Sequence, residues 1–373
     1  MAGGFSIRLI EWKCLYFSLI VSLTFCEQMS EILFDVGISD EVYAKEGMSV
    51  ILYVNPRMMF EITLKEGDCF TAQYGAFRHN DIIGKPYGSK VLSQNKKGFM
   101  ILLPYFSELW SSCLETRTQI IFPSDIGAIL GLLDARPGKL FAESGTGSAS
   151  LTHAIADSIG LKRQCLEPSF EDKLKYGHVF TFEYHSLRAD AARAELYKHG
   201  LAHSATVTQR DVYSNGLLPN ELIDIDLKSN QLLSSLKESI DKGEGFYDGI
   251  FLDLPSPWLA FDHAAQAVKK GGVIVTFSPC LEQCLQNNEK AREIGLIVGK
   301  TVQILNREMD TKRSKMKAPC CFFVPSSTDG KRRWCCEELD LKPSLPPELD
   351  VFTQTRICPL QRTHTGFLTT FYK

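Results

Sequence analysis

The stretch ESGTGSAS, residues 143–150, decides the fold, because two glycines there separate a strand pattern from a helix pattern. The preceding run, GKLFAES (138–144), is short and mostly apolar, which is typical of a buried strand. The following run, SASLTHAIADSIG (148–160), predicts a helix that ends on Gly160. A glycine-rich turn between strand and helix is where an α/β sheet binds ligands, although such turns also serve packing alone.

The same alternation of strand and helix patterns continues on the C-terminal side of this turn. A helix pattern at 186–200 ends on Gly200, and four further runs predict strands: 177–185, 204–212, 247–254 and 271–279. Such alternation predicts an α/β fold, with a doubly wound, mostly parallel Rossmann-like sheet and helices on both faces. The last apolar run, TGFLTTFYK (365–373), should return to this sheet as an edge or antiparallel strand.

A different pattern precedes the turn. From about residue 45 to 110, short apolar runs alternate with turn signals such as those around Gly67 and Gly88, which predicts a small β-rich domain. Residues 107–138 then predict a helix, a loop through Pro123 and a second helix.

The Rossmann-like domain is expected to span residues 111–373. Two polar stretches interrupt its pattern, at about 213–245 and at about 310–362, and the second is rich in Lys, Pro and Cys. We predict both as surface insertions rather than as domains.

The first thirty residues form an apolar extension whose role the sequence leaves open. The run CLYFSLIVSLTFC (14–26) is too short to span a bilayer comfortably but long enough for the core of a signal peptide. No small-residue cleavage site is clear, and Met29 opens a more normal polar start. We expect residues 1–30 to be an upstream extension or the product of a misplaced start codon, and we expect no membrane partner.

The composition excludes some classes of protein. The chain has 373 residues, of which 44% are hydrophobic and 23% charged, as in a globular protein with one large or two medium domains. The formal net charge of −3 argues against gathering nucleic acid by bulk attraction, so such a ligand needs a local patch or a partner. The twelve cysteines are scattered without the spacing of zinc knuckles, so we expect reduced thiols and no metal site.

The strand ends indicate a nucleoside-bearing cofactor. The third glycine of a dinucleotide fingerprint is replaced by Ser150, which disfavours NAD. Glu183 ends the second strand pattern, where an acid can bind both hydroxyls of a ribose, and Asp211 ends the third. The glycine turn and the two acids together describe a nucleoside cofactor without phosphates, for which S-adenosyl-L-methionine is the leading candidate.

A second stretch, FLDLPSPW (251–258), places an acid where a buried strand stops. Pro255 and Pro257 cannot donate hydrogen bonds to a further ladder, so the strand should end at Asp253. The prolines should also stiffen the turn, so that the Asp253 carboxylate points into the cleft beside the cofactor. The alternative role for Asp253 is to cap the turn, and Trp258 is expected to pack as a lid rather than to stack on a ligand.

The motifs together resemble those of the catalytic subunits of the tRNA adenine-N1 methyltransferases, the enzymes that methylate T-loop adenine 58. The stretches that carry the resemblance run in order from about residue 45 to the C-terminus: QYGAFRHNDIIGKPYGSKV (73–91), TQIIFPSDIGAI (118–129), ESGTGSAS, FEYH, RDV, DLPSPW, TFSPCLEQ (276–283) and HTGFLTTFYK. The first motif of this family usually reads Glu-Pro-Gly-Thr-Gly-Ser-Gly, and Ser144 and Ala149 replace its proline and last glycine here.

The resemblance implies a class I Rossmann-like methyltransferase that uses S-adenosyl-L-methionine to methylate N1 of adenine 58 in tRNA. It also implies a role for Asp253. N1 of adenine already has a lone pair but becomes cationic on methylation, and a carboxylate bonded to the exocyclic amine would stabilise that charge and accept its proton. Because the target adenine lies inside the folded tRNA elbow, its base must be splayed out and held in a pocket.

The predicted site residues follow from these motifs. Asp253 is the predicted catalytic residue. The predicted cofactor-binding residues are Gln119, Glu143, Gly145, Thr146, Gly147, Ser148, Ala149, Ser150, Leu151, Glu183, His185, Arg188, Asp211, Val212 and Asp253. In the β-rich domain, Arg78, His79 and Tyr87 are predicted to help hold RNA, although each could equally be surface decoration.

Two other functions stay open beside the active RNA methyltransferase. One is a noncatalytic tRNA-binding subunit of the same fold, but that subunit loses the glycine turn and the aspartate, and both are present here. The other is a methyltransferase of small molecules or proteins, which would need neither the β-rich domain nor DLPSPW. The predicted partners are tRNA and a noncatalytic tRNA-binding subunit in a heterotetramer, with a homotetramer as the alternative. The expected location is the nucleus, with the cytoplasm or mitochondrion as alternatives.

Overall fold

The computed structural model describes residues 42–56, 58–114, 118–159, 168–223, 231–305, 307, 309–315, 351–357 and 364–373. The chain divides into two compact units: the first comprises Met1–Gln303 and Thr365–Lys373, and the second Ile304–His364. The extension at 1–30 lies outside the described residues. Within the described ranges, no helix combines the length and apolar character that crossing a bilayer requires, and no group of His, Cys, Asp or Glu is arranged to hold a metal ion.

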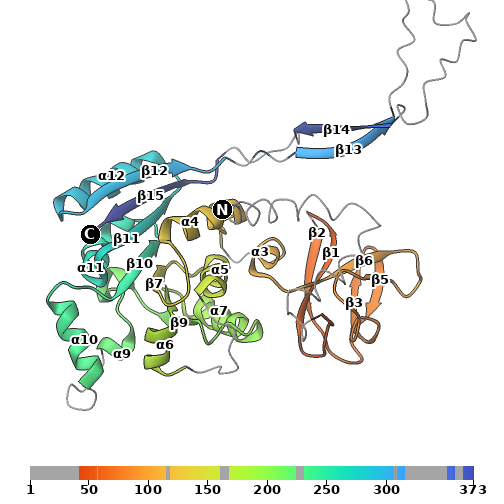
Figure 1. Ribbon diagram of the computed structural model, residues 1–373, viewed down its shortest axis with the longest axis horizontal. Helices are drawn as coiled ribbons and strands as arrows, with labels where there is room; N and C mark the ends of the chain where they lie inside the picture. Colours follow the sequence, from red (N-terminus) through yellow and green to blue (C-terminus); the bar gives the residue numbers. More distant parts are fainter. Residues whose placement is uncertain are drawn as a thin grey trace, which may run out of the picture. The chain divides into compact units, whose positions relative to one another are not determined.

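The first unit begins with a small antiparallel sheet built from the short apolar runs. Its strand order is β2-β1-β6-β5, and a separate hairpin pairs β3 with β4. The strands are β1 Ser49–Asn55, β2 Met58–Thr63, β3 Cys69–Ala72, β4 Gly75–Arg78, β5 Lys90–Leu92 and β6 Phe99–Pro104 (Figure 1). A hydrophobic cluster of its own, which includes Leu52, Phe77 and Met100, holds this region together. The small β-rich N-terminal region that the sequence predicts is therefore confirmed.

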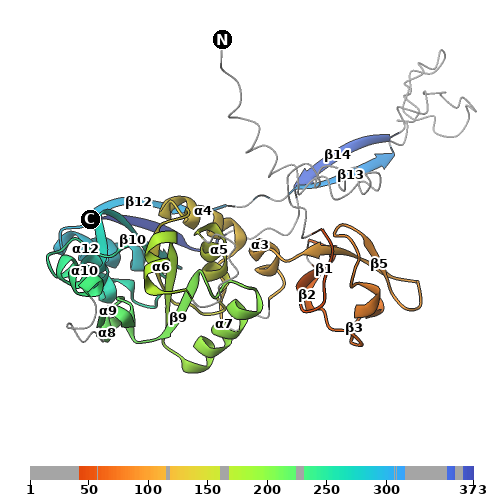
Figure 2. The same ribbon diagram turned by 60° about the horizontal axis from the view of Figure 1, so that its bottom comes forward.

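A mixed seven-stranded sheet follows. Its strand order is β12-β15-β11-β10-β7-β8-β9, in which β7 to β11 are parallel and β15 is antiparallel to both of its neighbours. The strands are β7 Leu140–Ser144, β8 His178–Glu183, β9 Ala205–Gln209, β10 Tyr247–Leu252, β11 Val268–Ser278, β12 Ile297–Gln303 and β15 Phe367–Tyr372 (Figure 1 and Figure 2). The chain moves outward from β7 to β9 and then returns to β10 on the other side of β7. The carboxyl ends of β7 and β10 therefore form the switch point where doubly wound sheets bind ligands.

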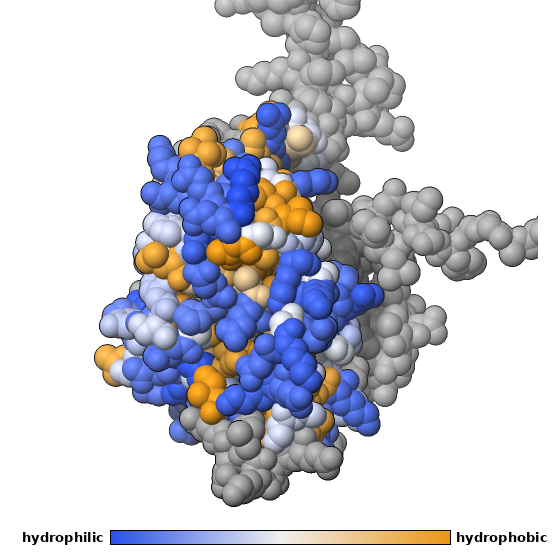
Figure 3. All heavy atoms as spheres, turned by 90° about the vertical axis from the view of Figure 1, so that its left-hand side faces the viewer, coloured by the Kyte–Doolittle hydropathy of each residue, from blue (hydrophilic) through white to orange (hydrophobic). Residues whose placement is uncertain are grey.

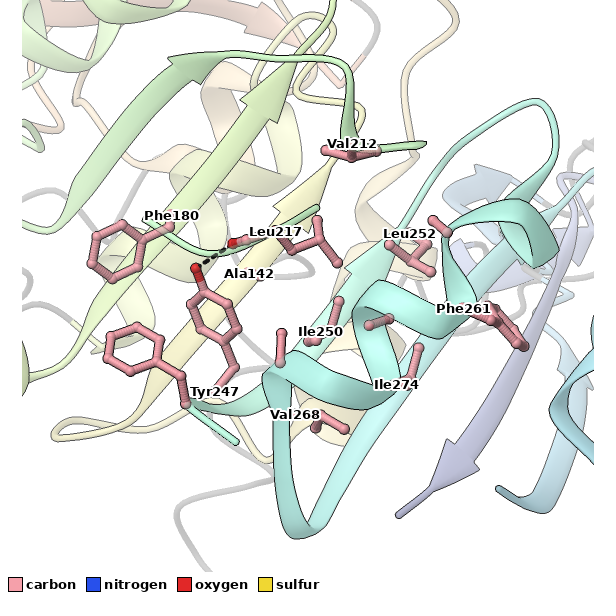
Figure 4. Packing of buried hydrophobic residues seen from close by; sticks show 14 of the residues in the cluster. Ala142, Phe180, Val212, Leu217, Tyr247, Ile250, Leu252, Phe261, Val268 and Ile274 are labelled. Carbon is pink, nitrogen blue, oxygen red and sulfur yellow. Dashed lines mark hydrogen bonds between the residues drawn. The ribbon is translucent and has the colours of Figure 1, made fainter. Parts of the chain in front are cut away.

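Helices cover both faces of this sheet, because the side chains of each strand alternate between the two. The helices are α3 Ser107–Trp110, α4 Pro123–Leu133, α5 Ser150–Ile159, α6 Phe170–Tyr176, α7 Ser186–Lys198, α8 Val212–Asn215, α9 Asn220–Ile223, α10 Gln231–Asp241, α11 Phe261–Ala267 and α12 Leu281–Glu293. On β10, a side chain at Gly249 would meet Leu133 of α4 on one face. Ile250 and Leu252 instead belong to the hydrophobic cluster of the opposite face, with Phe261 of α11 (Figure 4). The doubly wound α/β fold is confirmed.

The outer surface beyond β11 is mostly polar. Figure 3 shows the side of the first unit that carries α10, α11 and α12, where hydrophilic side chains predominate and smaller hydrophobic areas lie between them. On α12, Cys284, Asn287 and Ala291 are buried against the sheet, whereas Glu282 and Glu289 are exposed. α12 is therefore amphipathic, and it packs its buried face on the sheet and exposes its charged face.

The prediction of a surface insertion at about 213–245 is wrong for the described part of that segment. It contains the whole of α9 and α10 and all but the first residue of α8. Three of its side chains, those of Leu217, Leu222 and Ile240, are each 1% exposed and belong to the main hydrophobic cluster. The Tyr247 hydroxyl donates to the Leu217 carbonyl at 2.7 Å, which ties the segment to the start of β10 (Figure 4). The segment is a helical crossover of the fold.

Two boundaries also differ from the sequence-based prediction. The strand predicted at 204–212 ends at Gln209, because Asp211 is the N-cap of α8 and its carboxylate accepts the Tyr213 amide at 3.0 Å. Pro123 begins α4 rather than lying in a loop, since the first turn of a helix leaves amides unpaired and tolerates a residue without one.

The final apolar run lies inside the sheet. β15 is antiparallel, as predicted, but it lies between β11 and β12 and is therefore not an edge strand. Phe371 on β15 is 0% exposed, so the strand contributes to the core. The edge strand is β12, which the sequence pattern did not reveal.

The second unit contains one described ladder, in which β13 (Met309–Lys315) pairs antiparallel with β14 (Val351–Ile357). This ladder is the described part of the segment predicted as a surface insertion at about 310–362, and that prediction stays untested. The residues between the two strands lie outside the described ranges.

Candidate active site

A cleft opens at the switch point, at the carboxyl ends of β7, β8 and β10. It contains about 540 Å³ of empty space, part of it open to solvent. The lining residues come from the segment before α4, the glycine turn and the strand ends: Thr118, Gln119, Ile120, Ile121, Glu143, Gly145, Thr146, Gly147, Ser148, Ser150, Leu151, Glu183, Arg188 and Asp253.

Most of the predicted cofactor-binding residues line this cleft, and four do not. Ala149 is fully buried behind the glycine turn, and Val212 belongs to the hydrophobic core. The Asp211 carboxylate caps α8, and the His185 backbone amide donates to Glu183. The structure therefore does not bring these four side chains into the cleft.

Three lining residues were missed by the sequence reasoning: Thr118, Ile120 and Ile121. They flank Gln119 in the motif TQIIFPSDIGAI, so adjacency to Gln119 was the available signal. The Thr118 hydroxyl lies 3.1 Å from the Ser148 hydroxyl, and this contact holds the segment against the glycine turn.

The glycine turn and Asp253 are locked together through their backbones. Gly145 has φ +96°, and a Cβ there would lie 2.1 Å from the Asp253 carbonyl oxygen, so only glycine fits. The Asp253 amide donates to the Ser144 carbonyl at 2.9 Å. The Gly147 amide donates to Glu183 Oε2 at 2.9 Å. The turn therefore fixes the backbone of Asp253 relative to the cleft.

Ala149 holds a left-handed conformation, with φ +61°, at the position where the resembled family has glycine. An L-residue in this region costs roughly 1 kcal/mol or more. The Ala149 amide donates to the Thr146 carbonyl at 2.7 Å, and the Ala149 carbonyl lies 2.6 Å from His153 Nδ1. These bonds hold the turn in its strained form.

Glu183 is buried and ionised. Its Oε1 accepts hydrogen bonds from the Arg188 guanidinium at 2.6 and 3.0 Å and from the His185 amide at 3.0 Å, and its Oε2 accepts the Gly147 amide. Burial alone would raise the pKa of Glu183, but these hydrogen bonds outweigh it and lower the pKa. Lone pairs remain on Oε2, and the assignment of Glu183 to ribose hydroxyls stays a prediction.

Asp253 and Glu143 form an acidic wall of the cleft. Burial raises the pKa of Asp253 to about 7. Burial also raises the pKa of Glu143 to about 7, against hydrogen bonds from Thr152 and Thr181, and the nearby charges of Asp253 and Glu183 add to the increase. Groups with perturbed pKa values in a cleft are characteristic of functional sites.

The loop that follows Asp253 is held from two sides. The Ser256 amide donates to the Tyr213 hydroxyl at 3.1 Å, and Gln283 Nε2 donates to the Pro255 carbonyl at 3.0 Å. Tyr213 comes from α8 and Gln283 from α12, so the motifs RDV and TFSPCLEQ meet at this loop. Trp258 is partly buried in the short 3-10 helix Pro257–Ala260.

The residues predicted to hold RNA differ in their exposure. Arg78 is exposed at the end of β4. His79 is 6% exposed, and its Nδ1 accepts the Lys65 amide at 3.1 Å, so its side chain is structural. Tyr87 is partly buried and packs against the hydrophobic cluster of the small sheet. Burial of His79 argues against a direct contact with RNA, and the prediction stays untested for Arg78 and Tyr87.

Comparison with known proteins agrees with this geometry. The family model described as "tRNA methyltransferase complex GCD14 subunit" matches residues 98–230 and 235–372, and the model "TrmI-like N-terminal" matches residues 46–91. The tRNA (adenine(58)-N(1))-methyltransferase catalytic subunit of Dictyostelium discoideum is 36% identical over 273 residues, which cover 72% of this chain and 75% of that protein. The corresponding subunit of Kluyveromyces lactis is 33% identical over 281 residues, which cover 73% of this chain and 63% of that protein.

Solved structures share the fold. A SAM-dependent O-methyltransferase of Thermotoga maritima superposes with a TM-score of 0.62 at 21% identity, over 91% of this chain and 97% of the other. The tRNA (m1A58) methyltransferase TrmI of Aquifex aeolicus superposes with a TM-score of 0.55 at 18% identity, over 88% and 98%. Since the first family model covers well over half of the chain, and the Dictyostelium relative is 36% identical over 72% of it, the chain belongs to the family of the tRNA methyltransferase complex GCD14 subunit.

Proposed function

We propose that this chain is the catalytic subunit of a tRNA (adenine-58-N1)-methyltransferase that uses S-adenosyl-L-methionine. The observation that carries the proposal is Asp253, which lines the cleft and whose backbone amide is hydrogen-bonded to Ser144 beside the glycine turn. The names of the relatives, together with the TrmI fold, support the substrate and the reaction.

The cleft suits this cofactor by the chemistry of its side chains. The carboxyls of Glu143, Glu183 and Asp253 line it, and Arg188, a cation on its wall, is already bonded to Glu183. Such a lining favours a cationic, phosphate-free ligand. Glu183 would hold the ribose, and the backbone of the glycine turn would pack against the nucleoside. When bound, S-adenosyl-L-methionine supplies an electrophilic methyl group.

Asp253 would act on the target base. Methylation of adenine N1 would place positive charge on the ring and make the exocyclic amine more acidic. The Asp253 carboxylate would accept a hydrogen bond from this amine, stabilise the charge and take up its proton, which passes later to solvent. The raised pKa of Asp253, about 7, suits a group that must gain and lose a proton near neutral pH.

We also propose that a noncatalytic, basic subunit completes the tRNA site, in the heterotetramer that the resemblance implies. The net charge of −3 supports this, since it gives the chain little long-range attraction for tRNA. The nuclear location is likewise a proposal, and it rests on the resemblance alone.

The test of the catalytic role is Asp253→Asn, which keeps the shape of the side chain and removes its charge. We expect the rate of methylation of an unmodified tRNA transcript to fall by about 10²-fold or more, with the affinity for S-adenosyl-L-methionine little changed.

The matched control is Asp248→Asn, because Asp248 lies on β10, the strand that ends just before Asp253, where it accepts the Leu140 amide and pairs with Lys269. This variant should lower thermal stability without a comparable loss of rate. An Asp253→Asn enzyme that methylates at the wild-type rate would refute the catalytic assignment.

A further inference from the structure

A buried chain of hydrogen bonds joins the small N-terminal sheet to the glycine turn. Its members are Glu61 on β2, His199 after α7 and His153 on α5, and we call them the histidine chain. Glu61 Oε1 lies 3.0 Å from His199 Nε2, and His199 Nδ1 lies 3.0 Å from His153 Nε2. His153 Nδ1 lies 2.6 Å from the Ala149 carbonyl oxygen. Both imidazole side chains are 0% exposed.

The number of protons in this chain follows from its two ends. The Ala149 carbonyl can only accept a hydrogen bond, so His153 Nδ1 must carry a proton. Burial would raise the pKa of Glu61, but its hydrogen bonds with His199 and Lys198 lower it to about 2, so the carboxylate is also an acceptor. Three hydrogen bonds between two acceptors then need three ring protons. Two neutral imidazoles carry only two, so the pair holds one extra proton and one positive charge.

The surroundings of the two rings suit such a charge. The Tyr105 ring stacks on His199 with centroids 4.2 Å apart, and the Trp110 ring lies 4.0 Å from that of His153. Aromatic faces attract cations. Trp110 Nε1 donates to Glu61 Oε2 at 3.0 Å and holds the carboxylate in place.

Other titratable groups also act on this region. They are Tyr105 and Cys113 beside α3, Asp157 on α5, and Glu195 and Lys198 on α7. Of these, Lys198 competes with the charged pair for Glu61, whereas Asp157 and Glu195 add negative potential.

We propose that the histidine chain is a positioning device, in which one extra proton keeps the N-terminal sheet fastened to the glycine turn at Ala149. If that proton is lost, two lone pairs face each other at one of the three links, and that link opens. The bonds at the Ala149 carbonyl constrain a strained residue whose neighbours, Ser148 and Ser150, line the cleft. Loss of the proton should therefore loosen the turn.

The first test counts the ring protons directly. In the full chain labelled with ¹⁵N-histidine, the ring nitrogen shifts of His153 and His199 should show three protons on the pair at neutral pH. The chain has eight histidines, so His153→Gln and His199→Gln would assign the signals. In Glu61→Gln, the amide can donate to a neutral His199 while still accepting from Trp110, so the pair should be neutral. Two neutral rings in the wild-type chain would overturn the proposal.

The second test follows the affinity for S-adenosyl-L-methionine by calorimetry as the pH rises. Asp253 and Glu143 titrate in every variant, so the difference between the profiles of two variants isolates the histidine chain. Wild-type affinity should fall relative to that of Glu61→Gln by about fivefold or more as the extra proton is lost. Identical profiles would overturn the positioning role. His199→Gln, which removes one of the two imidazoles, should behave like Glu61→Gln and replaces it in this test if Glu61→Gln does not fold.

The matched control is Glu238→Gln, the same substitution in an exposed ion pair on α10. It should reproduce the wild-type profile in both tests. The calorimetric test rests on the proposed cofactor, whereas the proton count does not. A chain with three ring protons but no affinity for the cofactor would therefore contradict the proposed function and leave the protonation of the pair established.

Discussion

The carboxyl groups of Asp253 and Glu143 are desolvated by burial in the folded chain. Their pKa values, each about 7, lie above the value of about 4 that such acids have in an unfolded chain. The folded state therefore binds these protons more tightly than the unfolded state does. As the pH rises from about 4 to about 7, these two acids lower the free energy of unfolding. This loss of stability arises at two residues that line the candidate site.

The same pKa values predict the pH dependence of the reaction. If Asp253 acts as the ionised base, kcat/KM of the wild-type enzyme for tRNA, measured at saturating S-adenosyl-L-methionine, should rise as the pH rises through about 7 and then level off. The two acids interact, so the apparent value belongs to the pair. Steady-state rates over about pH 5.5 to 9 would check this, and a flat profile would contradict it.

A stability measurement serves as the control for this pH dependence. The thermal midpoint of Asp253→Asn should decline less between about pH 5 and 7 than that of the wild-type chain, since one of the two titrating acids is gone.

Ala149 allows a test of backbone strain. Replacing it by glycine removes the strain energy of the left-handed φ, roughly 1–2 kcal/mol. The same change removes a buried methyl group, which contributes ~0.8 kcal/mol, and raises the conformational entropy of the unfolded chain. We expect Ala149→Gly to leave the free energy of unfolding unchanged within about 1 kcal/mol.

The control for this substitution is Ala154→Gly in the interior of α5. Ala154 is also buried but has no left-handed conformation to relieve, so its replacement should destabilise by about 1–2 kcal/mol. Denaturant titrations would compare the two, and equal losses would contradict the strain at Ala149.

The sequence revealed those site residues that act where a strand ends. Gly145, Glu183 and Asp253 each follow an apolar run, and parallel strands bring their carboxyl ends to one edge. His153 and His199 left no such signal, because they lie 46 positions apart and meet only through packing between α5 and α7. Side-chain contacts of this kind are not encoded in local periodicity.

At the scale of elements, α8 and α12 support the loop that follows Asp253, the proposed catalytic residue. Tyr213 and Gln283 hold the backbone at Ser256 and Pro255, and Asp253 stands just before these positions. Placement of a catalytic group within about an ångström matters, since such a displacement can cost up to about 10²-fold in rate. Gln283, the last residue of the motif TFSPCLEQ, therefore helps to position the loop after Asp253.

Gln283→Met tests that role, because it keeps the length of the side chain and removes the hydrogen bond to Pro255. We expect kcat to fall by about tenfold, with little change in cofactor affinity, since the glycine turn is untouched. Gln286→Met, an exposed position on the same helix, should leave kcat unchanged. Single-turnover rates would separate the two variants, and equal rates would count against the support of the loop by α12.

The alternation of strands and helices predicted the order of the main elements but not all of their boundaries. β12 was missed because IVGKTVQ is mostly exposed and shows no clean period of two. The helices between β9 and β10 were missed because polar side chains on their outer faces hide three buried positions. Both failures arise where tertiary packing, rather than the local pattern, decides the structure.

At the scale of the whole molecule, charge decides how the chain meets its substrate. With a net charge of −3, the isolated chain should bind unmodified tRNA only weakly, with a Kd of about 1 μM or weaker at physiological salt. Addition of the proposed basic subunit should lower the Kd for tRNA and make that Kd depend more strongly on the salt concentration. Fluorescence titrations at two ionic strengths would measure this, and tight, salt-sensitive binding by the chain alone would show that no such partner is needed.

The position of β15 within the sheet bears on how the chain is synthesised. Residues 304–366 are made between β12 and β15, which takes on the order of several seconds at about 5–20 residues per second. During that time β11 and β12 have no strand between them, and their facing edges offer unpaired backbone groups to other chains. The nascent polypeptide is therefore most open to aggregation, and most in need of a chaperone, late in translation, when nearly all of its sheet already exists.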